Sequence, residues 1–267
     1  MKALPQVRDV GIGTGIGAFS GLLGVGGGLL LVPLLVLTRG MEQKRAQATS
    51  LVMVFTAAAG GAVTYALNSS IAWLPAVFIV VGGLTGSWIG THTVQRTPDH
   101  WLQLAFGVLL ALVAVRLALT PSAGPGGANV IPTLTVLAGL GYVLSGVAMG
   151  FLSALFGIGG GIILIPILVT GFGYQQQLAS GTSLAVMFPI ALLGAVRLSR
   201  VGLTQWPLGL RFGIGSIAGA VIGALLALSL PAEVLRIIFA VVMVFISYRM
   251  IRQGWRARRR STEREIQ

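Results

Sequence analysis

The chain has 267 residues, of which 55% are hydrophobic and 9% are charged. A soluble domain usually carries about 25% charged residues, so this composition excludes an ordinary soluble protein and indicates an all-α integral membrane protein. The net charge of +12 does not indicate nucleic-acid binding, because the basic residues gather in the tail and at the ends of apolar segments.

Eight apolar segments follow one another along the chain. Two stretches without Asp, Glu, Lys or Arg, 46–95 and 117–196, are too long for one crossing, since about 20 apolar residues span the hydrocarbon. The predicted segments are about 10–38, 46–67, 72–94 and 101–119, followed by 134–170, 179–198, 206–229 and 233–252.

The first segment, 10–38, contains the glycine cluster Gly24–Gly28, interrupted only by a valine. Glycine is a poor helix former, so the cluster predicts a break in the helix. The segment then either crosses the membrane once or turns back as a hairpin, with arms 10–23 and 28–38 that are about 21 and 16 Å long. The hairpin leaves fewer basic residues outside the cytoplasm and therefore obeys the positive-inside rule better.

The second half of the chain repeats the first at a constant offset of 133 residues. Gly24–Pro33 recurs as Gly157–Pro166, and Thr49-Ser50-Leu51 recurs as Thr182-Ser183-Leu184. The chain is therefore a duplicated unit. Since each half has an odd number of full crossings, the pattern predicts two inverted repeats, each a broken re-entrant helix pair plus three transmembrane helices.

The repeat sets the domain boundaries. Residues 1–119 and 134–252 form the two transmembrane repeats, 120–133 form a linker loop rich in glycine and proline, and 253–267 form a basic cytoplasmic tail. Glycines spaced four residues apart in the third segment of each half predict close helix packing without chemistry. They are Gly82, Gly86 and Gly90, with Gly215, Gly219 and Gly223.

The chain lacks the residues that most enzymes and metal sites need. It has no cysteine, its carboxylates lie at segment ends or in the tail, and its two histidines lack the spacing of metal ligands. We therefore expect no enzyme activity, no metal and no cofactor. His92 is interpreted as an interfacial histidine, with proton handling as the alternative.

The two glycine clusters predict an anion site. A helix that begins after Gly28 or Gly161 directs its free N–H groups and the positive end of its dipole into the membrane centre. Consecutive N–H groups also form an anion nest. The alternative is that these glycines only permit tight helix packing. The predicted binding residues are Gly26, Gly27 and Gly28, with Gly159, Gly160 and Gly161.

Five polar or charged side chains are further candidates. The hydroxyls of Thr49, Ser50, Thr182 and Ser183, which we place at the openings of the next helices, either donate to an oxyanion or serve their own helix as N-caps or back-bonded side chains. Arg211 lies inside an apolar stretch, where it either holds an anionic substrate or extends to the cytoplasmic interface.

The doubled motif resembles that of a known family. GVGGG followed by VP, and GIGGG followed by IP, each with a later ATSL or GTSL, is similar to the TauE/SafE family of sulfite and sulfonate exporters, over about residues 10–252. The resemblance implies an inner-membrane permease for small sulfur-containing anions such as sulfite, sulfoacetate, thiosulfate or sulfolactate. It also implies that the six glycines and the four hydroxyl residues named above take part.

We therefore expect a transporter of small sulfur-containing oxyanions, an exporter by the resemblance, that works by alternating access with the anion near the midplane. It would lie in the cell inner membrane as a multi-pass protein with cytoplasmic N- and C-termini. The alternatives are an anion channel and a non-transporting membrane scaffold or lipid-binding protein. Expected partners are a small anionic substrate and anionic lipid headgroups at the basic tail, with no nucleic acid; a homo-oligomer stays open.

Overall fold

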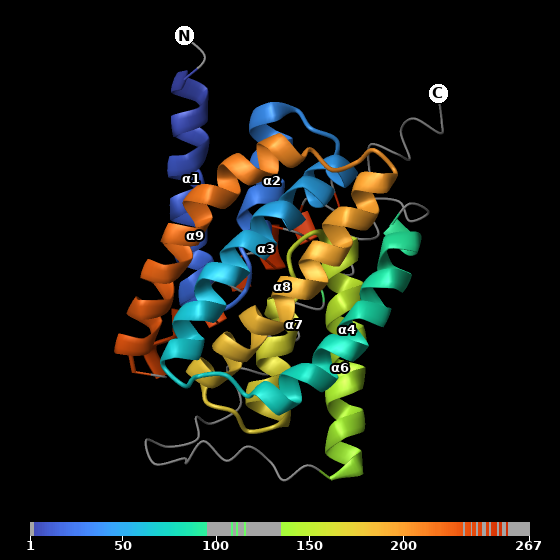
Figure 1. Cartoon of the computed structure of the whole chain (residues 1–267), viewed down its shortest axis with the longest axis vertical. Helices are drawn as coiled ribbons and strands as arrows, with labels where there is room; N and C mark the ends of the chain where they lie inside the picture. The colour runs from blue at the N-terminus through green and yellow to red at the C-terminus, as the bar shows by residue number, and fades with distance from the viewer. Residues whose placement is uncertain are drawn as a thin grey trace.

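The computed structural model describes residues 3–94 and 135–231, with scattered residues from 108 to 115 and from 233 to 255. Within these residues the secondary structure is helical, as the sequence predicts, and Figure 1 shows a bundle of long helices. The elements are α1 (Ala3–Leu23), α2 (Gly28–Arg39), α3 (Gln43–Leu67), α4 (Trp73–Val94), α6 (Val136–Phe156), α7 (Gly161–Pro166), the π-helix η1 (Ile167–Gly171), α8 (Gln176–Arg200) and α9 (Trp206–Ser229).

Five of these helices, α3, α4, α6, α8 and α9, are long and apolar enough to cross a membrane. The predicted segments match the observed helices within three residues at each end of α3, α4, α8 and α9. The linker 120–133 and all of the tail except Trp255 lie outside the described residues, so the lipid-binding prediction stays a prediction.

The first apolar segment reverses direction at its glycine cluster. An ion pair between Asp9 of α1 and Arg39 of α2 joins the far ends of the two helices, so α1 and α2 form a hairpin. The arms are unequal, because α1 extends seven residues before the predicted start at residue 10 and so has 21 residues against 12 in α2. At about 1.5 Å per residue, α1 is about 31 Å long and α2 about 18 Å.

The second half contains an equivalent hairpin. Here α6, also of 21 residues, precedes the short arm α7 and η1. The ring of Tyr142 on α6 stacks on Phe172 with ring centroids 4.2 Å apart, and its hydroxyl lies 3.0 Å from the hydroxyl of Tyr174. These contacts join the start of α6 to the chain that follows η1, so the glycine cluster between them is again the turn.

In each half of the chain, the first helix packs against a helix of the other half. Helix α1 lies along α9 of the second half, and α6 lies along α4 of the first, while α3 and α8 contact each other between these pairs. A Cβ added to Gly219 of α9 would lie 2.0 Å from the carbonyl oxygen of Thr14, and one added to Gly86 of α4 would lie 2.1 Å from that of Val147. The recurring glycines are therefore sites of backbone-to-backbone packing, which confirms that prediction.

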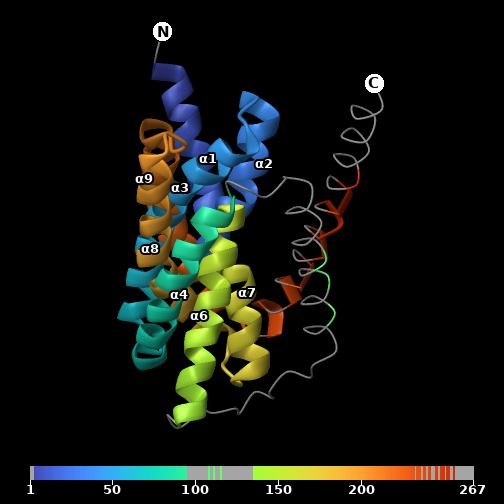
Figure 2. The ribbon, with the colours of Figure 1, turned by 90° about the vertical axis from the view of Figure 1, so that its right-hand side faces the viewer.

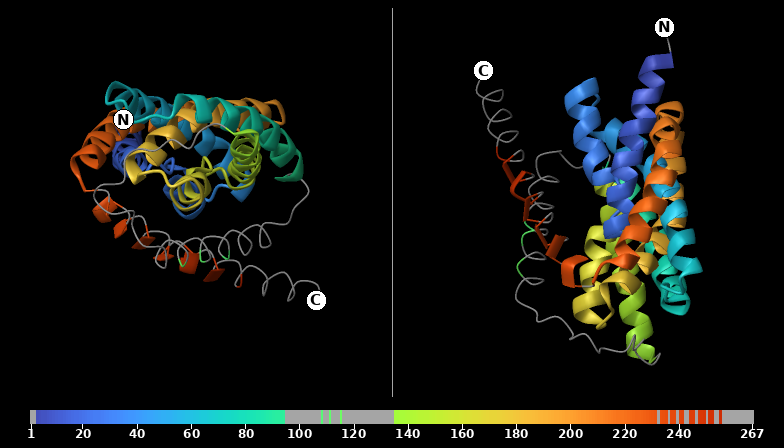
Figure 3. Two further views of the ribbon diagram at one scale, coloured as in Figure 1. Left: turned by 90° about the horizontal axis from the view of Figure 1, so that it is seen from below. Right: turned by 90° about the vertical axis from the view of Figure 1, so that its left-hand side faces the viewer.

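The helices start at opposite ends of the bundle. Helix α1 begins at the end marked N, whereas α6 begins at the other end, at the bottom of Figures 1 and 2. The short arm α2 lies in the upper part of the bundle and α7 in the lower part, as the side views in Figures 2 and 3 show. The beginnings of α2 and α7 therefore lie toward the middle of the bundle.

Candidate functional site

The two glycine clusters lie against each other in the interior. A Cβ added to Gly28 would lie 2.1 Å from the carbonyl oxygen of Gly157, and one added to Gly161 would lie 2.4 Å from that of Gly24. These two contacts are related by the repeat, so each helix start packs on the turn of the other half. The structure thus brings together the two sets of glycines that the sequence proposes as one site.

Backbone conformation explains why the turns are built of glycine. Gly24 and Gly26 have φ values of 70° and 75°, and Gly157, Gly159 and Gly160 have values of 66°, 91° and 76°. These values lie in the left-handed region, which side chains with a Cβ rarely adopt. Such turns end α1 and α6 and allow α2 and α7 to begin a few residues later.

The helix starts have the geometry of an N-terminus. The N–H of Leu31 donates to the carbonyl of Gly27 at 3.1 Å, and the N–H of Leu164 donates to that of Gly160 at 3.2 Å. Since the first N–H groups of a helix have no partner within it, the groups of Gly28 and Gly161 are the available donors at each break. Helix α7 has six residues and continues into η1, so this short arm ends at Gly171.

The two serines tie each half to the turn of the other. The hydroxyl of Ser50 donates to the carbonyl of Gly157 or of its own helix at Gln47, and that of Ser183 donates to the carbonyl of Gly24 at 3.0 Å. Each serine has one hydroxyl proton, so a serine that donates to a carbonyl cannot at the same time donate to an anion.

Thr49 and Thr182, which precede the two serines, also form hydrogen bonds to the other half of the chain, but as acceptors. The hydroxyl of Thr49 accepts from the N–H of Gln205 at 3.1 Å, and that of Thr182 accepts from the N–H of Ala72 at 3.0 Å. Helices α3 and α8 begin six residues before these threonines, so the N-cap interpretation of Thr49 and Thr182 is wrong. The bonds use lone pairs of the hydroxyls and do not consume their protons.

Removing either serine hydroxyl is expected to destabilise the protein. Ser50→Ala or Ser183→Ala leaves a buried carbonyl without its cross-half donor, which costs about 1–2 kcal/mol of unfolding free energy. Thermal or denaturant unfolding of the purified protein measures the change. The control is Ser229→Ala, because Ser229 is exposed and bonds only within its own helix turn. Equal stability of all three variants would contradict the role assigned to the serines.

Two apolar side chains fill the space between the breaks. A Cβ added to Gly26 would lie 2.1 Å from the methyl carbon of Met187, and one added to Gly159 would lie 2.3 Å from the same atom. Val54, the repeat partner of Met187, borders both glycines, and both side chains are fully buried. An anion at the breaks therefore requires Met187 to move. Its unbranched thioether changes rotamer more readily than a branched side chain does.

Arg211 lies away from the glycine breaks. It is half-buried in the second turn of α9, next to Phe212, whose backbone packs on Gly13 of α1. Gly24 follows Gly13 by eleven residues, about 16 Å along the helix. Two residues before Arg211, a Cβ added to Gly209 would lie 2.9 Å from the carbonyl oxygen of Thr49, so this turn of α9 packs beside one predicted site residue.

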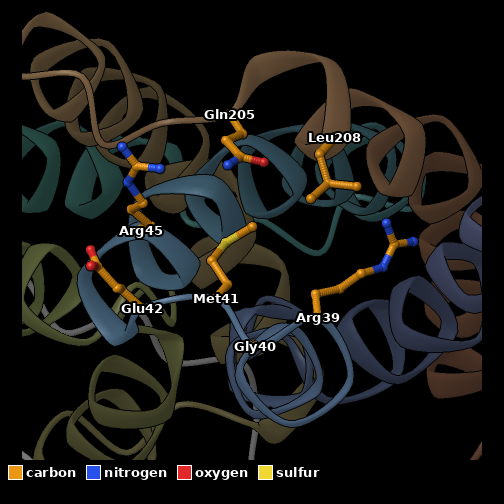
Figure 4. Close-up of a pocket in the computed structure, with 7 residues that line it drawn as sticks. All are labelled: Arg39, Gly40, Met41, Glu42, Arg45, Gln205 and Leu208. Atoms are coloured by element: carbon orange, nitrogen blue, oxygen red, sulfur yellow. The ribbon is translucent and has the colours of Figure 1, made fainter.

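A polar pocket that the sequence did not predict lies at the end of the bundle where α2 ends and α3 and α9 begin (Figure 4). Its volume is about 370 Å³, and Figure 4 labels its seven lining residues, two of them arginines. The sequence analysis did not propose Arg39 or Arg45 as site residues. The sequence did contain a signal for this pocket, because three basic residues lie near Gly40, between the apolar segments 10–38 and 46–67.

These features define a class of protein. A duplicated bundle of spanning-length helices, with an interrupted apolar segment in each half, is the architecture of a membrane transporter. The chain belongs to the TauE/SafE family, since the family model described as "Sulfite exporter TauE/SafE" matches residues 2–117 and 142–267.

Curated relatives carry transporter names. A probable membrane transporter protein of Xylella fastidiosa is 28% identical over 254 residues, 93% of this chain and 96% of that protein. The probable membrane transporter protein YunE of Bacillus subtilis is 25% identical over 257 residues, 89% of this chain and 94% of its own. The probable membrane transporter protein MJ0441 of Methanocaldococcus jannaschii is 30% identical over 194 residues, 69% of this chain and 68% of its own. The comparison with solved structures finds no match.

Proposed function

We propose that this transporter moves small sulfur-containing oxyanions, such as sulfite or organosulfonates, out of the cell by alternating access. The observation that carries the proposal is the meeting of two helix starts, after Gly27 and Gly160, inside the bundle. Helix N-termini bind anions through free N–H groups and the helix dipole, without an ionised side chain. The family description names sulfite, and it is our source for this substrate.

The proposed membrane arrangement has two inverted repeats. The two hairpins enter from opposite sides of the cell inner membrane, and the glycine turns meet near its midplane. The opposite starting ends of α1 and α6 support this arrangement. Arg39 and Arg45 lie at the end where α1 begins, which the positive-inside rule assigns to the cytoplasm. The N- and C-termini are then both cytoplasmic.

The proposed binding residues are the glycines of the two breaks. The N–H groups at Gly26–Gly28 and Gly159–Gly161 hold the anion, and the hydroxyl protons of Thr49 and Thr182 are available to it. Ser50 and Ser183 hold the turns in place and donate to the anion only if they release their carbonyl partners. Arg211 assists the anion along its path rather than at the breaks, because it lies about 16 Å along the bundle from them.

Movement of the anion requires two changes. Met187 leaves the space between Gly26 and Gly159, and one group of helices shifts against the other. The closely packed pairs α1 with α9 and α4 with α6 have backbones in contact, so each pair moves as a unit. The contact between α3 and α8 is where the two units slide.

Flux through the reconstituted protein tests the proposal. Proteoliposomes loaded with sulfite are expected to release it in a saturable manner, and sulfite on the opposite side is expected to accelerate exchange. Sulfoacetate, taurine, thiosulfate and sulfate are compared in the same assay, with empty liposomes as the control. Non-saturable flux without exchange would indicate a channel, and the absence of flux for every anion would contradict the proposed substrate class.

A further inference from the structure

The polar pocket at the end of the hairpin, named here the Arg39 pocket, has the composition of an anion site. It is lined by Arg39, Gly40, Met41, Glu42, Arg45, Gln205 and Leu208. Figure 4 shows the two arginines on opposite sides, with Met41, Gln205 and Leu208 between them. Two guanidinium groups and one carboxylate give the lining a net positive charge. A volume of about 370 Å³ is ample for a small oxyanion.

One of the two arginines is held by a buried carboxylate. Arg39 contacts the Oδ1 atom of Asp9, whose side chain is 1% exposed, while that of Arg39 is 39% exposed. The other oxygen of Asp9, Oδ2, has no hydrogen-bond partner within the described part of the chain. A guanidinium has five N–H donors, so Arg39 retains donors for a second anion beside Asp9. Asp9 and a bound anion would compete for this cation.

The second hairpin has a different contact at the same place. The repeat offset relates Asp9 to Tyr142 and Arg39 to Phe172, which form an aromatic stack instead of an ion pair. Tyrosine hydroxyls are neutral at physiological pH, and burial raises the pKa of the neighbouring Tyr174, whose hydroxyl lies beside that of Tyr142, still further, so this contact carries no charge. Only the first hairpin is therefore closed by a pair that an anion is able to compete with.

We propose that the Arg39 pocket is a second anion site, on one side of the transporter, in which a small oxyanion shares the guanidinium of Arg39 with Asp9. Arg45 and the side-chain amide of Gln205 supply the remaining donors. Sharing the cation weakens the contact between α1 and α2, so arrival of the anion loosens the hairpin whose turn carries the first glycine break. The inference rests on the proposed function, since it assumes that sulfite-like anions are the cargo.

The same oxyanion chemistry occurs in lipid headgroups. A phosphate of an anionic lipid would use the same guanidinium groups as a free sulfite does. We assign the pocket to the free anion, because it lies between α2, α3 and α9 and is lined by side chains from all of them. Nanodiscs with and without phosphatidylglycerol distinguish the two sources.

The test is a set of binding measurements on the full chain in phosphatidylcholine nanodiscs, with sulfite as the probe. Arg39→Gln is expected to weaken sulfite binding at least about tenfold, because a charge-assisted hydrogen bond is lost. Asp9→Asn is expected to strengthen binding, because it removes the competing carboxylate. The control is Arg8→Gln, which removes the same charge from an exposed position next to Asp9.

Arg39→Gln leaves Asp9 buried without its cation and threatens the fold. The double variant Asp9→Asn with Arg39→Gln removes both charges; it is expected to fold and to bind sulfite as weakly as Arg39→Gln. If the parent protein binds and transports sulfite, but all these variants bind it as Arg8→Gln does, the inference fails and the proposed function stands. If the parent protein binds no sulfite, both fail. Loss of sulfite binding when phosphatidylglycerol is added would assign the pocket to lipid and overturn the inference.

Discussion

Alanine at Gly28 or Gly161 is expected to abolish anion flux and to destabilise the protein strongly. The added Cβ would lie 2.1 or 2.4 Å from a backbone carbonyl oxygen of the opposite half, where no flexible side chain is able to move aside. The two halves would have to separate at the breaks. We expect a loss of about 3 kcal/mol in unfolding free energy, at the upper end of overpacking effects. Unfolding of the purified protein and sulfite flux in proteoliposomes measure the two effects.

The matched control is Gly15→Ala, in the middle of α1. No atom lies within 4 Å of a Cβ added to Gly15, so alanine there is expected to stabilise the helix slightly. Gly27 is a weaker test, because its added Cβ would meet the ends of the Met53 and Ile16 side chains, which are able to adjust. Normal flux in both Gly28→Ala and Gly161→Ala would contradict a site at the breaks.

Met187→Ala is expected to cost about 3 kcal/mol of unfolding free energy, because it removes a fully buried side chain and leaves a cavity. The cavity would lie between the two glycine breaks, where the proposed anion binds. We therefore expect the variant to be less stable without anion and to gain more stability from added sulfite than the parent protein gains. Thermal unfolding with and without sulfite measures both changes.

Met187→Leu tests whether the flexibility of the side chain at this position matters when its volume is kept. Leucine nearly conserves the volume, so the stability change is expected to stay below about 1.5 kcal/mol, while the branched side chain is stiffer. Flux through Met187→Leu is expected to fall although the protein stays folded, because the side chain has to leave the space between the breaks. A variant with leucine that transports at the parent rate would show that Met187 does not obstruct the path.

The sequence predicted the helices well because their causes are local. Apolar segments of spanning length, bounded by polar residues, define α3, α4, α8 and α9, and glycine clusters define the turns. The repeat offset paired the turns correctly. The true length of α1 was missed, because Arg8 and Asp9 appeared to lie before the helix, whereas the helix continues through both and Asp9 pairs with Arg39 of α2.

The partners of the polar side chains were not predictable from the sequence. Thr49 and Ser50 read as helix-opening residues, yet their partners, Gln205 and Gly157, lie in the other half of the chain. The periodicity of the sequence predicts which face of a helix is apolar. It does not predict which carbonyl, distant in the sequence, will accept a hydrogen bond from a given hydroxyl. The Arg39 pocket was missed for the same reason, since two of its residues come from the other half of the chain: Leu208 lies on α9, and Gln205 directly precedes that helix.

The exchange of helices between the halves constrains the order in which the protein is assembled. Helix α1 leaves the ribosome well before α9, the helix whose backbone fits its glycine-lined face. At translation rates of roughly 5–20 residues per second, α1 waits about ten seconds or more for that partner. Membrane insertion of the early helices therefore precedes their packing. In a nascent chain that stops before Trp206, the glycine-lined face of α1 has no partner helix, and quality-control proteases are able to recognise this exposed face.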